Sequence, residues 1–285
     1  MERQQDLSDR TRARLRCGDL TLCGVSIAGE QTAVAVPELD VCFDIGLCPR
    51  EVLSCGHLCL THGHMDHSAG LAYYFSQRDF QGMQPGTALM PGGMVKPVKQ
   101  MLKAWDRIEG KASPRQIVGL GDGDEYEIRR NLRIQAFSVP HTTASLGYVV
   151  YNRREKLLDE YLGLASAQIV ELKKQGQNIT RTVRVPLVCY LGDVELEKLQ
   201  WTDLMRQARI LVIECTFFED GHQHRARYGK HVHLDDLLEL LPGLQNEYVV
   251  LTHLSRRTDM RKAKQLLAEK LKRDQRDRIH FFMAR

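Results

Sequence analysis

The sequence predicts an α/β protein built as a layered sandwich. Short apolar stretches that read as strands alternate with stretches at helical spacing along the chain. A first half of strands and helices is followed by a second half of similar kind, and no clear linker separates them. Helices and sheets that bury their apolar faces on one another give layered architectures. We therefore expect one domain that covers residues 1–285.

The first half opens with strand-like segments that Gly and Pro interrupt. The buried strand after them stops at a histidine cluster, and Leu71, Tyr74, Phe75 and Arg78 then recur at helical spacing. The predicted elements are strands at 19–27, 32–36, 39–46 and 57–63, a helix at 66–80, a strand and turn at 87–93, and a helix at 95–109.

The second half repeats this alternation, with longer strands and a basic C-terminal helix. Its predicted elements are a hairpin at 125–141, a strand at 147–154, helices at 154–163 and 166–176, strands at 185–193 and 208–217, a helix at 234–241, a strand at 247–253, a helix at 256–278 and a strand at 279–282.

Composition favours a cytoplasmic protein. Apolar runs are far shorter than the roughly 18 residues that a membrane span needs, so no membrane association is expected. The charged N-terminus lacks the apolar segment of a secretory signal. The eight cysteines form no zinc-knuckle pairs, and we expect them to be reduced and structural. The net charge of +4 permits a polyanionic partner without requiring one.

Four apolar strands end in residues that bind metals in other proteins. The strand endings are HLCLTHGHMDH, FSVPH, VCYLGD and VVLTH. Strand ends lie along one edge of a sheet, so distant side chains meet there, and imidazole and carboxylate are ligands for zinc, iron and manganese. Taken one at a time, His141 and His253 are interpreted as ordinary histidines, and Asp193 as an ordinary turn residue. Together with the HxHxDH turn at 62–67 they indicate a dinuclear metal site.

This order of motifs resembles the metallo-β-lactamase superfamily across nearly the whole chain. More narrowly, the sequence resembles the ribonuclease Z family of tRNA 3′-processing endonucleases, above all its short plant-type forms. The resemblance implies a metallo-β-lactamase αββα four-layer sandwich. It rests on FDIG at 43–46, THGHMDH at 61–67, YFSQRDF at 74–80, HTTASLGYVV at 141–150, LGD at 191–193, VIECTF at 212–217, HVH at 231–233 and LTHLSRR at 251–257.

The resemblance implies two divalent metal ions, zinc first, with manganese or iron as alternatives. One set of ligands is His62, His64 and His141. The other is Asp66, His67 and His253, and Asp193 bridges the two ions. Such a pair lowers the pKa of a bridging water, so that a hydroxide attacks the phosphorus near neutral pH.

Two further residues, together with Asp66, are expected to act in catalysis. Glu214 and His231 resemble the family's carboxylate–histidine pair, in which the imidazole donates a proton to the departing 3′ oxygen. Asp66 is expected to orient or deprotonate the bridging water. His231 also lies in a histidine-rich, flexible-looking stretch, so an ordinary surface role stays open.

The sequence departs from the family pattern in the region of its tRNA-binding arm. Residues 154–180 form a shorter insertion without the Gly-Pro tip of the family's flexible arm. Lysines there would contact phosphates if the segment is a reduced substrate arm. A solvated helix on a different phosphodiesterase is the alternative. The N-terminal strand also lacks the family's LGTG turn, and the family's His-Ser-Thr is His231, Val232 and His233 here.

The function expected from the resemblance is metal-dependent cleavage of a tRNA precursor, or of another RNA, by a homodimer. The alternative is a small-molecule phosphodiesterase or another ester hydrolase on the same scaffold, because a fold does not fix a function. A noncatalytic RNA-binding subunit is disfavoured because every expected metal-ligand position still has a residue that can bind metal. A β-lactamase is disfavoured because no secretory signal is evident.

Overall fold

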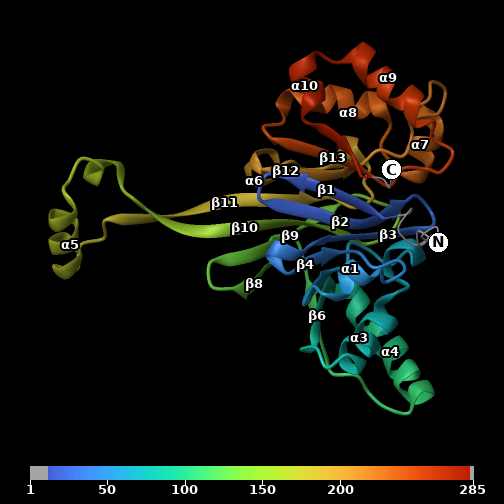
Figure 1. The fold of residues 1–285 in the computed structure, drawn as a ribbon, viewed down its shortest axis with the longest axis horizontal. Coiled ribbons are helices and arrows are strands. Elements are labelled where there is room, and N and C mark those ends of the chain that lie inside the picture. The colour runs from blue at the N-terminus through green and yellow to red at the C-terminus, as the bar shows by residue number, and fades with distance from the viewer. Residues whose placement is uncertain (1–11, 283–285) are drawn as a thin grey trace, which may run out of the picture.

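The computed structural model describes residues 12–282 and shows four layers (Figure 1). Within these residues two seven-stranded sheets face each other, and helices cover the outer face of each sheet. The predicted αββα sandwich is confirmed. The chain ends at 1 and 285, and with them most of the charged N-terminal segment, lie outside the described residues.

The first sheet is antiparallel from β1 to β4 and parallel from β4 to β7. Its strands, in spatial order, are β1 (Ala13–Cys17), β2 (Leu20–Ile27), β3 (Gln31–Val36), β4 (Val41–Phe43), β5 (His57–Cys59), β6 (Gly86–Pro91) and β7 (Arg115–Leu120).

The second sheet has the same plan, antiparallel from β8 to β11 and parallel from β11 to β14. Its strands are β8 (Glu125–Arg129), β9 (Leu132–Val139), β10 (Ser145–Leu157), β11 (Thr180–Tyr190), β12 (Ile210–Glu214), β13 (Tyr248–Thr252) and β14 (Ile279–Phe281).

Strand β12 shows why the central strands are continuously apolar. Successive side chains of a strand point to opposite faces. Ile210 and Val212 therefore enter the core between the sheets, whereas Leu211 and Ile213 pack under the outer helices. A strand that is buried on both faces has no position for a polar residue until it ends. In β12 that position is Glu214.

Helices complete the two outer layers. Those over the first sheet are α1 (Arg50–Leu53), α2 (Met65–Ser68), α3 (Leu71–Phe80) and α4 (Val95–Glu109). Those over the second sheet are α6 (Asp203–Gln207), α7 (Gln223–Gly229), α8 (Leu234–Leu240), α9 (Met260–Lys270) and α10 (Arg273–Asp277). Short 3-10 turns occur at Pro37–Leu39, Gly92–Met94, Asp159–Tyr161, Leu196–Lys198 and Leu241–Gly243. Among the described residues, no helix combines the length and apolarity that a membrane span requires.

Three predicted elements are wrong in detail. The helix expected at 66–80 is divided into α2 and α3 by a turn at Ala69 and Gly70. The helix expected at 154–163 is instead the end of β10, which runs to Leu157 and pairs with β11 from Tyr148–Tyr190 to Leu157–Thr180. This pairing satisfies the backbone and overrides the helix propensity of the segment. The basic C-terminal helix is divided into α9 and α10, because Leu271 adopts an extended conformation between them.

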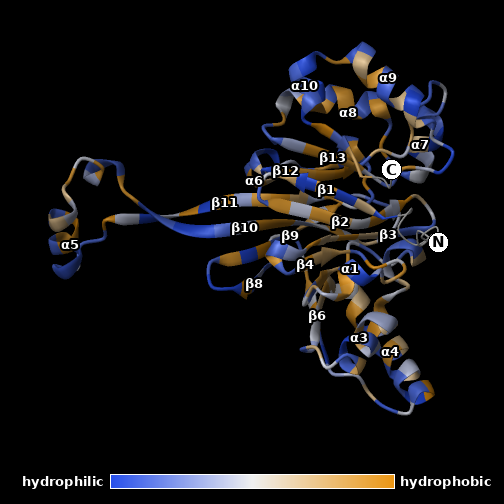
Figure 2. Ribbon diagram, in the orientation of Figure 1, coloured by the Kyte–Doolittle hydropathy of each residue, from blue (hydrophilic) through white to orange (hydrophobic). Residues whose placement is uncertain are grey.

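The hairpin of β10 and β11 forms an arm that leaves the body of the molecule (Figure 1). Helix α5 (Ser166–Lys174), which the sequence predicts at 166–176, lies at its tip. Figure 2 shows that β10 becomes hydrophilic along this stem, in contrast to its apolar start inside the sandwich.

Candidate metal centre

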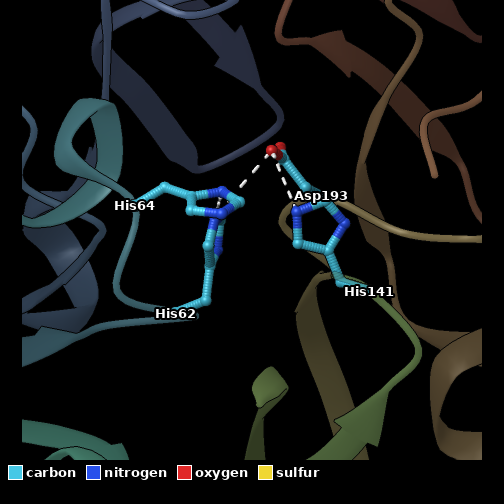
Figure 3. A group of neighbouring side chains, drawn as sticks. All are labelled: His62, His64, His141 and Asp193. Carbon is cyan, nitrogen blue, oxygen red and sulfur yellow. Dashed lines mark hydrogen bonds and ion pairs between the residues drawn. The ribbon is translucent and has the colours of Figure 1, made fainter. Parts of the chain in front are cut away.

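The seven predicted metal ligands meet at one edge of the sandwich. One group of ligand atoms within 4.8 Å of one another comes from His62, His64, His141 and Asp193 (Figure 3). A second such group comes from Asp66, His67 and His253. The residues follow the carboxyl ends of β5 in the first sheet and of β9, β11 and β13 in the second. The predicted convergence of strand ends is therefore seen at one edge of the sandwich, but the strands belong to two sheets and not to one as expected. Their role as ligands stays a prediction.

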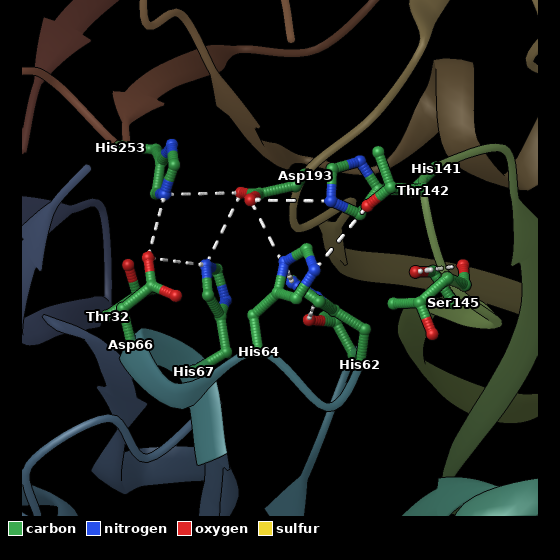
Figure 4. Close-up of polar contacts among 12 residues, drawn as sticks. Thr32, His62, His64, Asp66, His67, His141, Thr142, Ser145, Asp193 and His253 are labelled. Atoms are coloured by element: carbon green, nitrogen blue, oxygen red, sulfur yellow. Dashed lines mark hydrogen bonds and ion pairs between the residues drawn. The ribbon is translucent and has the colours of Figure 1, made fainter. Parts of the chain in front are cut away.

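Asp193 lies between the two groups of side chains (Figure 4). Its Oδ2 is 3.9 Å from Nε2 of His62 and 3.8 Å from Nε2 of His141. Its Oδ1 is 3.5 Å from Nε2 of both His67 and His253. One carboxylate thus presents a different oxygen to each group, as a bridging ligand would.

The buried polar atoms of the centre fit a bound cation. Nε2 of His67, Nε2 of His141 and Oδ1 of Asp193 are buried without a hydrogen-bond partner. Buried polar groups are normally paired, because an unpaired one costs free energy. These three unpaired atoms all face the space between the ligand groups, and nitrogen and carboxylate donors suit a divalent transition metal.

Each buried imidazole of the ligand set is held through its Nδ1, which leaves Nε2 directed at the centre. His67 donates to Asp44 Oδ2 at 2.9 Å, and His141 to the carbonyl of Lys230 at 3.3 Å. His62 Nδ1 lies 2.9 Å from Thr61 Oγ1, whose hydroxyl donates to Asp44. His253 Nδ1 lies 3.1 Å from Thr216 Oγ1. Such orienting contacts fix the tautomer and direction of a ligating histidine.

Sequence reasoning does not find Asp44, the most connected of these orienting residues. Its carboxylate is fully buried and accepts from the backbone and hydroxyl of Thr61, from His67 and from the hydroxyl of Tyr190. Its position directly after β4, within FDIG, was a usable signal, since it too is a polar residue at a strand end.

Backbone conformation at the site is unusual at two non-glycine residues. Asp44 and His253 have φ of 57° and 55°, in the left-handed region. Such conformations cost free energy and persist where the surrounding structure fixes them. Gly192, with φ of 66°, precedes Asp193, and a Cβ there would lie 2.8 Å from a methyl carbon of Thr61. Glycine is therefore required in LGD.

His231 and Glu214 form the predicted pair beside the centre. His231 Nδ1 donates to Glu214 Oε1 at 2.9 Å, and Glu214 itself is buried. Burial alone would lower the pKa of His231, but the charge and the hydrogen bond of Glu214 outweigh burial and raise that pKa to about 9. His231 also lies within 4.8 Å of Asp193 and His253, so proximity alone would allow it to bind metal. Its Nδ1, however, is already engaged by Glu214.

At the predicted ligands His62 and His141 burial is the dominant effect, and it lowers their pKa values. Neutral imidazole is the form that binds a metal. His64 is exposed and Asp66 is half-buried, so the centre is open to solvent on this side.

The fold and this histidine–aspartate centre define a metal-dependent hydrolase of the metallo-β-lactamase type. The sequence model of the "Beta-lactamase superfamily domain" matches residues 50–254. "tRNase Z TRZ1" of Arabidopsis thaliana is 33% identical over 238 residues, which cover 82% of this chain and 85% of that protein. "Nuclear ribonuclease Z" of Triticum aestivum is 35% identical over 174 residues, 61% of this chain and 99% of that protein. The chain belongs to the ribonuclease Z family of the β-lactamase superfamily.

Solved structures agree with the fold. Zn²⁺-bound PqqB from Methylobacterium extorquens superimposes with a TM-score of 0.59 at 14% identity, covering 95% of this chain and 97% of that one. The short form of human tRNase Z gives a TM-score of 0.51 at 14% identity, covering 87% and 93%. At this identity the similarity shows the fold alone.

Proposed function

We propose that the protein is a metal-dependent phosphodiesterase that removes the 3′ trailer from tRNA precursors. Its relatives named tRNase Z support this substrate. The observation that carries the proposal is Asp193, one carboxylate placed between two groups of ligand side chains. A centre of this kind suits a reaction in which a phosphate and an attacking water must be held side by side.

The proposed centre holds two divalent ions. His62, His64 and His141 would hold one, and Asp66, His67 and His253 the other, with Asp193 shared. Zinc is the first choice, because histidine and carboxylate donors of this number suit it, and manganese and iron use the same donors. When bound, the cations would supply positive charge to the phosphate and lower the pKa of a water molecule.

The protein's own residues would perform the proton transfers. His231, fixed by Glu214 through Nδ1, would donate a proton from Nε2 to the departing 3′ oxygen. Asp66 is the more exposed of the two carboxylates in the centre, and it would accept a hydrogen bond from the attacking water and so orient it. Glu214 would keep the imidazole protonated and in one tautomer until the bond breaks.

The arm is proposed to bind the tRNA, with residues 154–180 as a reduced substrate arm on a single domain of residues 1–285. Residues 154–180 carry four Lys or Arg residues and four Asp or Glu residues, and Arg153, Arg181 and Arg184 add positive charge just outside this range. Lys173 and Lys174 are exposed on α5, far from the body of the molecule (Figure 1). These two neighbouring lysines, at the end of a long stem, suit a contact with the phosphates of a folded RNA at a distance from the scissile bond.

We also propose a homodimer that forms through α3 and α4. Large apolar side chains are exposed on these two helices, at Tyr73, Phe80, Met101, Trp105 and Ile108. The hydrogen bond between Ser76 and Glu109 places the two helices side by side. Contiguous exposed apolar surface marks interaction sites. Light scattering on the protein and on Trp105→Glu tests this assembly, and a monomeric parent protein would contradict it.

We propose that the protein is located in the cytoplasm. Two relatives are named "tRNase Z TRZ2, chloroplastic" and "Nuclear ribonuclease Z", so compartments differ among relatives. Imaging of a tagged protein in its own cells would test this proposal.

The decisive experiment offers the purified, metal-analysed protein two substrates, a tRNA precursor and bis(p-nitrophenyl) phosphate. The expected result is cleavage of the precursor after the discriminator base, which leaves a 3′-hydroxyl on the tRNA, with about two metal ions per chain. Hydrolysis of the small ester alone would favour a small-molecule phosphodiesterase. Metal-loaded protein that cleaves neither substrate would contradict both readings.

A further inference from the structure

A hollow of about 440 Å³ opens directly beside His231. It is lined by Phe217, His224, Arg225, Tyr228, Gly229 and His231, and these described residues include no carboxylate. Aromatic side chains and a cation thus line a space next to the proposed proton donor. That combination is how proteins hold single-stranded nucleic acid, by stacking bases and attracting phosphates.

The aromatic surfaces of the hollow are arranged in advance. Arg225 lies over the ring of Phe217, at 5.6 Å from its centroid, and within 3.4 Å of His222 Nε2. The ring of Phe217 is 6.3 Å from that of His231. Ala226 is buried and Gln223 donates to Asp235, so helix α7 is anchored to the body. Phe217 and Arg225 therefore present a fixed platform at the edge of the reaction centre.

Tyr228 is the exposed aromatic residue in the lining of the hollow. It is 87% exposed, although a tyrosine ring usually buries most of its surface. Gly229, beside it, leaves the edge of His231 open, because a Cβ there would lie 2.9 Å from a ring carbon of His231. An aromatic ring held in solvent and an uncovered imidazole both favour a ligand that occupies the space between them.

A second cavity, of about 260 Å³, lies on the other side of Phe217, towards α9. Arg225, Arg257 and Lys262 line it, but the carboxylates of Glu219 and Asp259 do as well. Asp259 already accepts hydrogen bonds from the backbone of α9, at Arg261 and Lys262. The two carboxylates make this cavity less suited to a polyanion than the hollow at Tyr228, whose lining has none.

We propose that the hollow between Phe217 and Tyr228 binds an unpaired nucleobase of the RNA, that of the nucleotide whose 3′ oxygen departs. This assignment rests on the proposed function. In that reaction only Nε2 of His231 is free to reach the departing 3′ oxygen, since Nδ1 donates to Glu214. The base attached to the same ribose therefore lies within reach of the side chains around His231.

Paired substitutions in protein and RNA test the subsite. The probe is a tRNA precursor with an uncleavable methylene phosphonate at the scissile linkage, with either the normal base or an abasic residue at the upstream nucleotide. Affinity is measured by fluorescence anisotropy with the metal-loaded protein. Loss of the base is expected to weaken binding to the unsubstituted protein about tenfold, the scale of stacking on one aromatic side chain.

The same loss is expected to have almost no effect on Tyr228→Leu and Phe217→Leu, because the base has no ring to stack on in these variants. Tyr228→Phe keeps the ring and should respond like the unsubstituted protein. Equal weakening of normal and abasic RNA by both leucine variants would overturn the subsite. The leucine variants could instead lose sensitivity only to an abasic residue on the trailer side of the scissile bond. That result would overturn the assignment to the upstream nucleotide. Cleavage of an ordinary precursor by the unsubstituted protein is measured separately. A failure of the proposed function can therefore be distinguished from a failure of the subsite.

Discussion

Nδ1 of His67 donates a hydrogen bond of 2.9 Å to Oδ2 of Asp44, and both side chains are buried at the base of the metal centre. Asp44 follows β4 and His67 lies in α2, so the contact joins the sheet to the HxHxDH turn. Tyr190 of β11 donates to the same carboxylate oxygen at 3.0 Å. Asp44 therefore ties the histidine turn of the first sheet to a strand of the second.

We expect Asp44→Asn to lower metal affinity or activity by about 10- to 100-fold, the usual effect of losing the partner that orients a ligating histidine. Asparagine keeps the shape of the side chain, but its amide is uncharged. Its nitrogen also cannot accept the hydrogen bonds that the second carboxylate oxygen accepts. Metal content by mass spectrometry and activity on the tRNA precursor measure the effect.

Asp40→Asn is the matched control for this substitution. Asp40 also has a positive φ, 56°, and its Oδ2 lies 3.0 Å from Nδ1 of His57. It precedes β4, at the opposite end of the strand from the metal centre. Unchanged metal content in both variants would show that Asp44 supports the fold alone.

The predicted metal ligands could be picked out from the sequence, whereas the pairing of each histidine with the residue that orients it could not. A ligand such as Asp193 or His253 directly follows a strand that is apolar throughout, so its polarity stands out locally. Asp44 and Thr216 orient histidines through contacts with residues that are distant in sequence, such as His67 and His253. The strand end before Asp44 marks it as a candidate, but no local pattern shows that Asp44 or Thr216 orients a particular histidine.

The arm shows the same limit for secondary structure. Residues 154–163 have good helix formers, and their pattern predicts a helix. Pairing of Arg154 with Val183 and of Leu157 with Thr180 decides the conformation instead. Because the partner strand begins more than twenty residues later, the local pattern carries no sign of it.

Removing the imidazole of His231 separates proton donation from metal binding. We expect His231→Ala to lower turnover of the tRNA precursor roughly 100-fold or more, the range for a general acid, with metal content unchanged. His253→Ala should instead lose metal, since its Nε2 faces Asp193 and Asp66. Loss of metal from His231→Ala would identify His231 as a ligand. His280→Ala, in the remote strand β14, is the control for loss of a histidine.

Charge reversal at the tip of the arm should weaken binding of the tRNA precursor in a salt-dependent manner. For Lys173→Glu with Lys174→Glu, we expect a higher KM and a logarithmic salt dependence that is less steep by about 1.4 to 1.8, since each phosphate contact contributes roughly 0.7 to 0.9. Lys264→Glu, an exposed change of the same kind on α9, is the control. An unchanged salt dependence in the double variant would exclude α5 from the RNA contact.

Buried thiols should make the stability of the protein fall at alkaline pH. All eight cysteines are free, and burial raises the pKa of Cys17 and Cys23 to about 11 and that of Cys48 to about 12. In the unfolded chain a thiol titrates near pH 8.5, so above this pH the unfolded state binds fewer protons than the folded state. The stabilising contribution is complete below pH 8.5 and is lost progressively as the pH rises towards 11 or 12.

Urea unfolding in the presence of a reducing agent, at pH 7 and at pH 10, measures this loss as a lower free energy of unfolding at pH 10. Alkylation with iodoacetamide at pH 8 provides an independent readout. The folded protein is expected to react slowly, because few thiolates form and most thiols are buried, whereas the urea-unfolded protein should take up eight labels. Rapid labelling of several cysteines in the folded protein would contradict the burial on which the pH dependence rests.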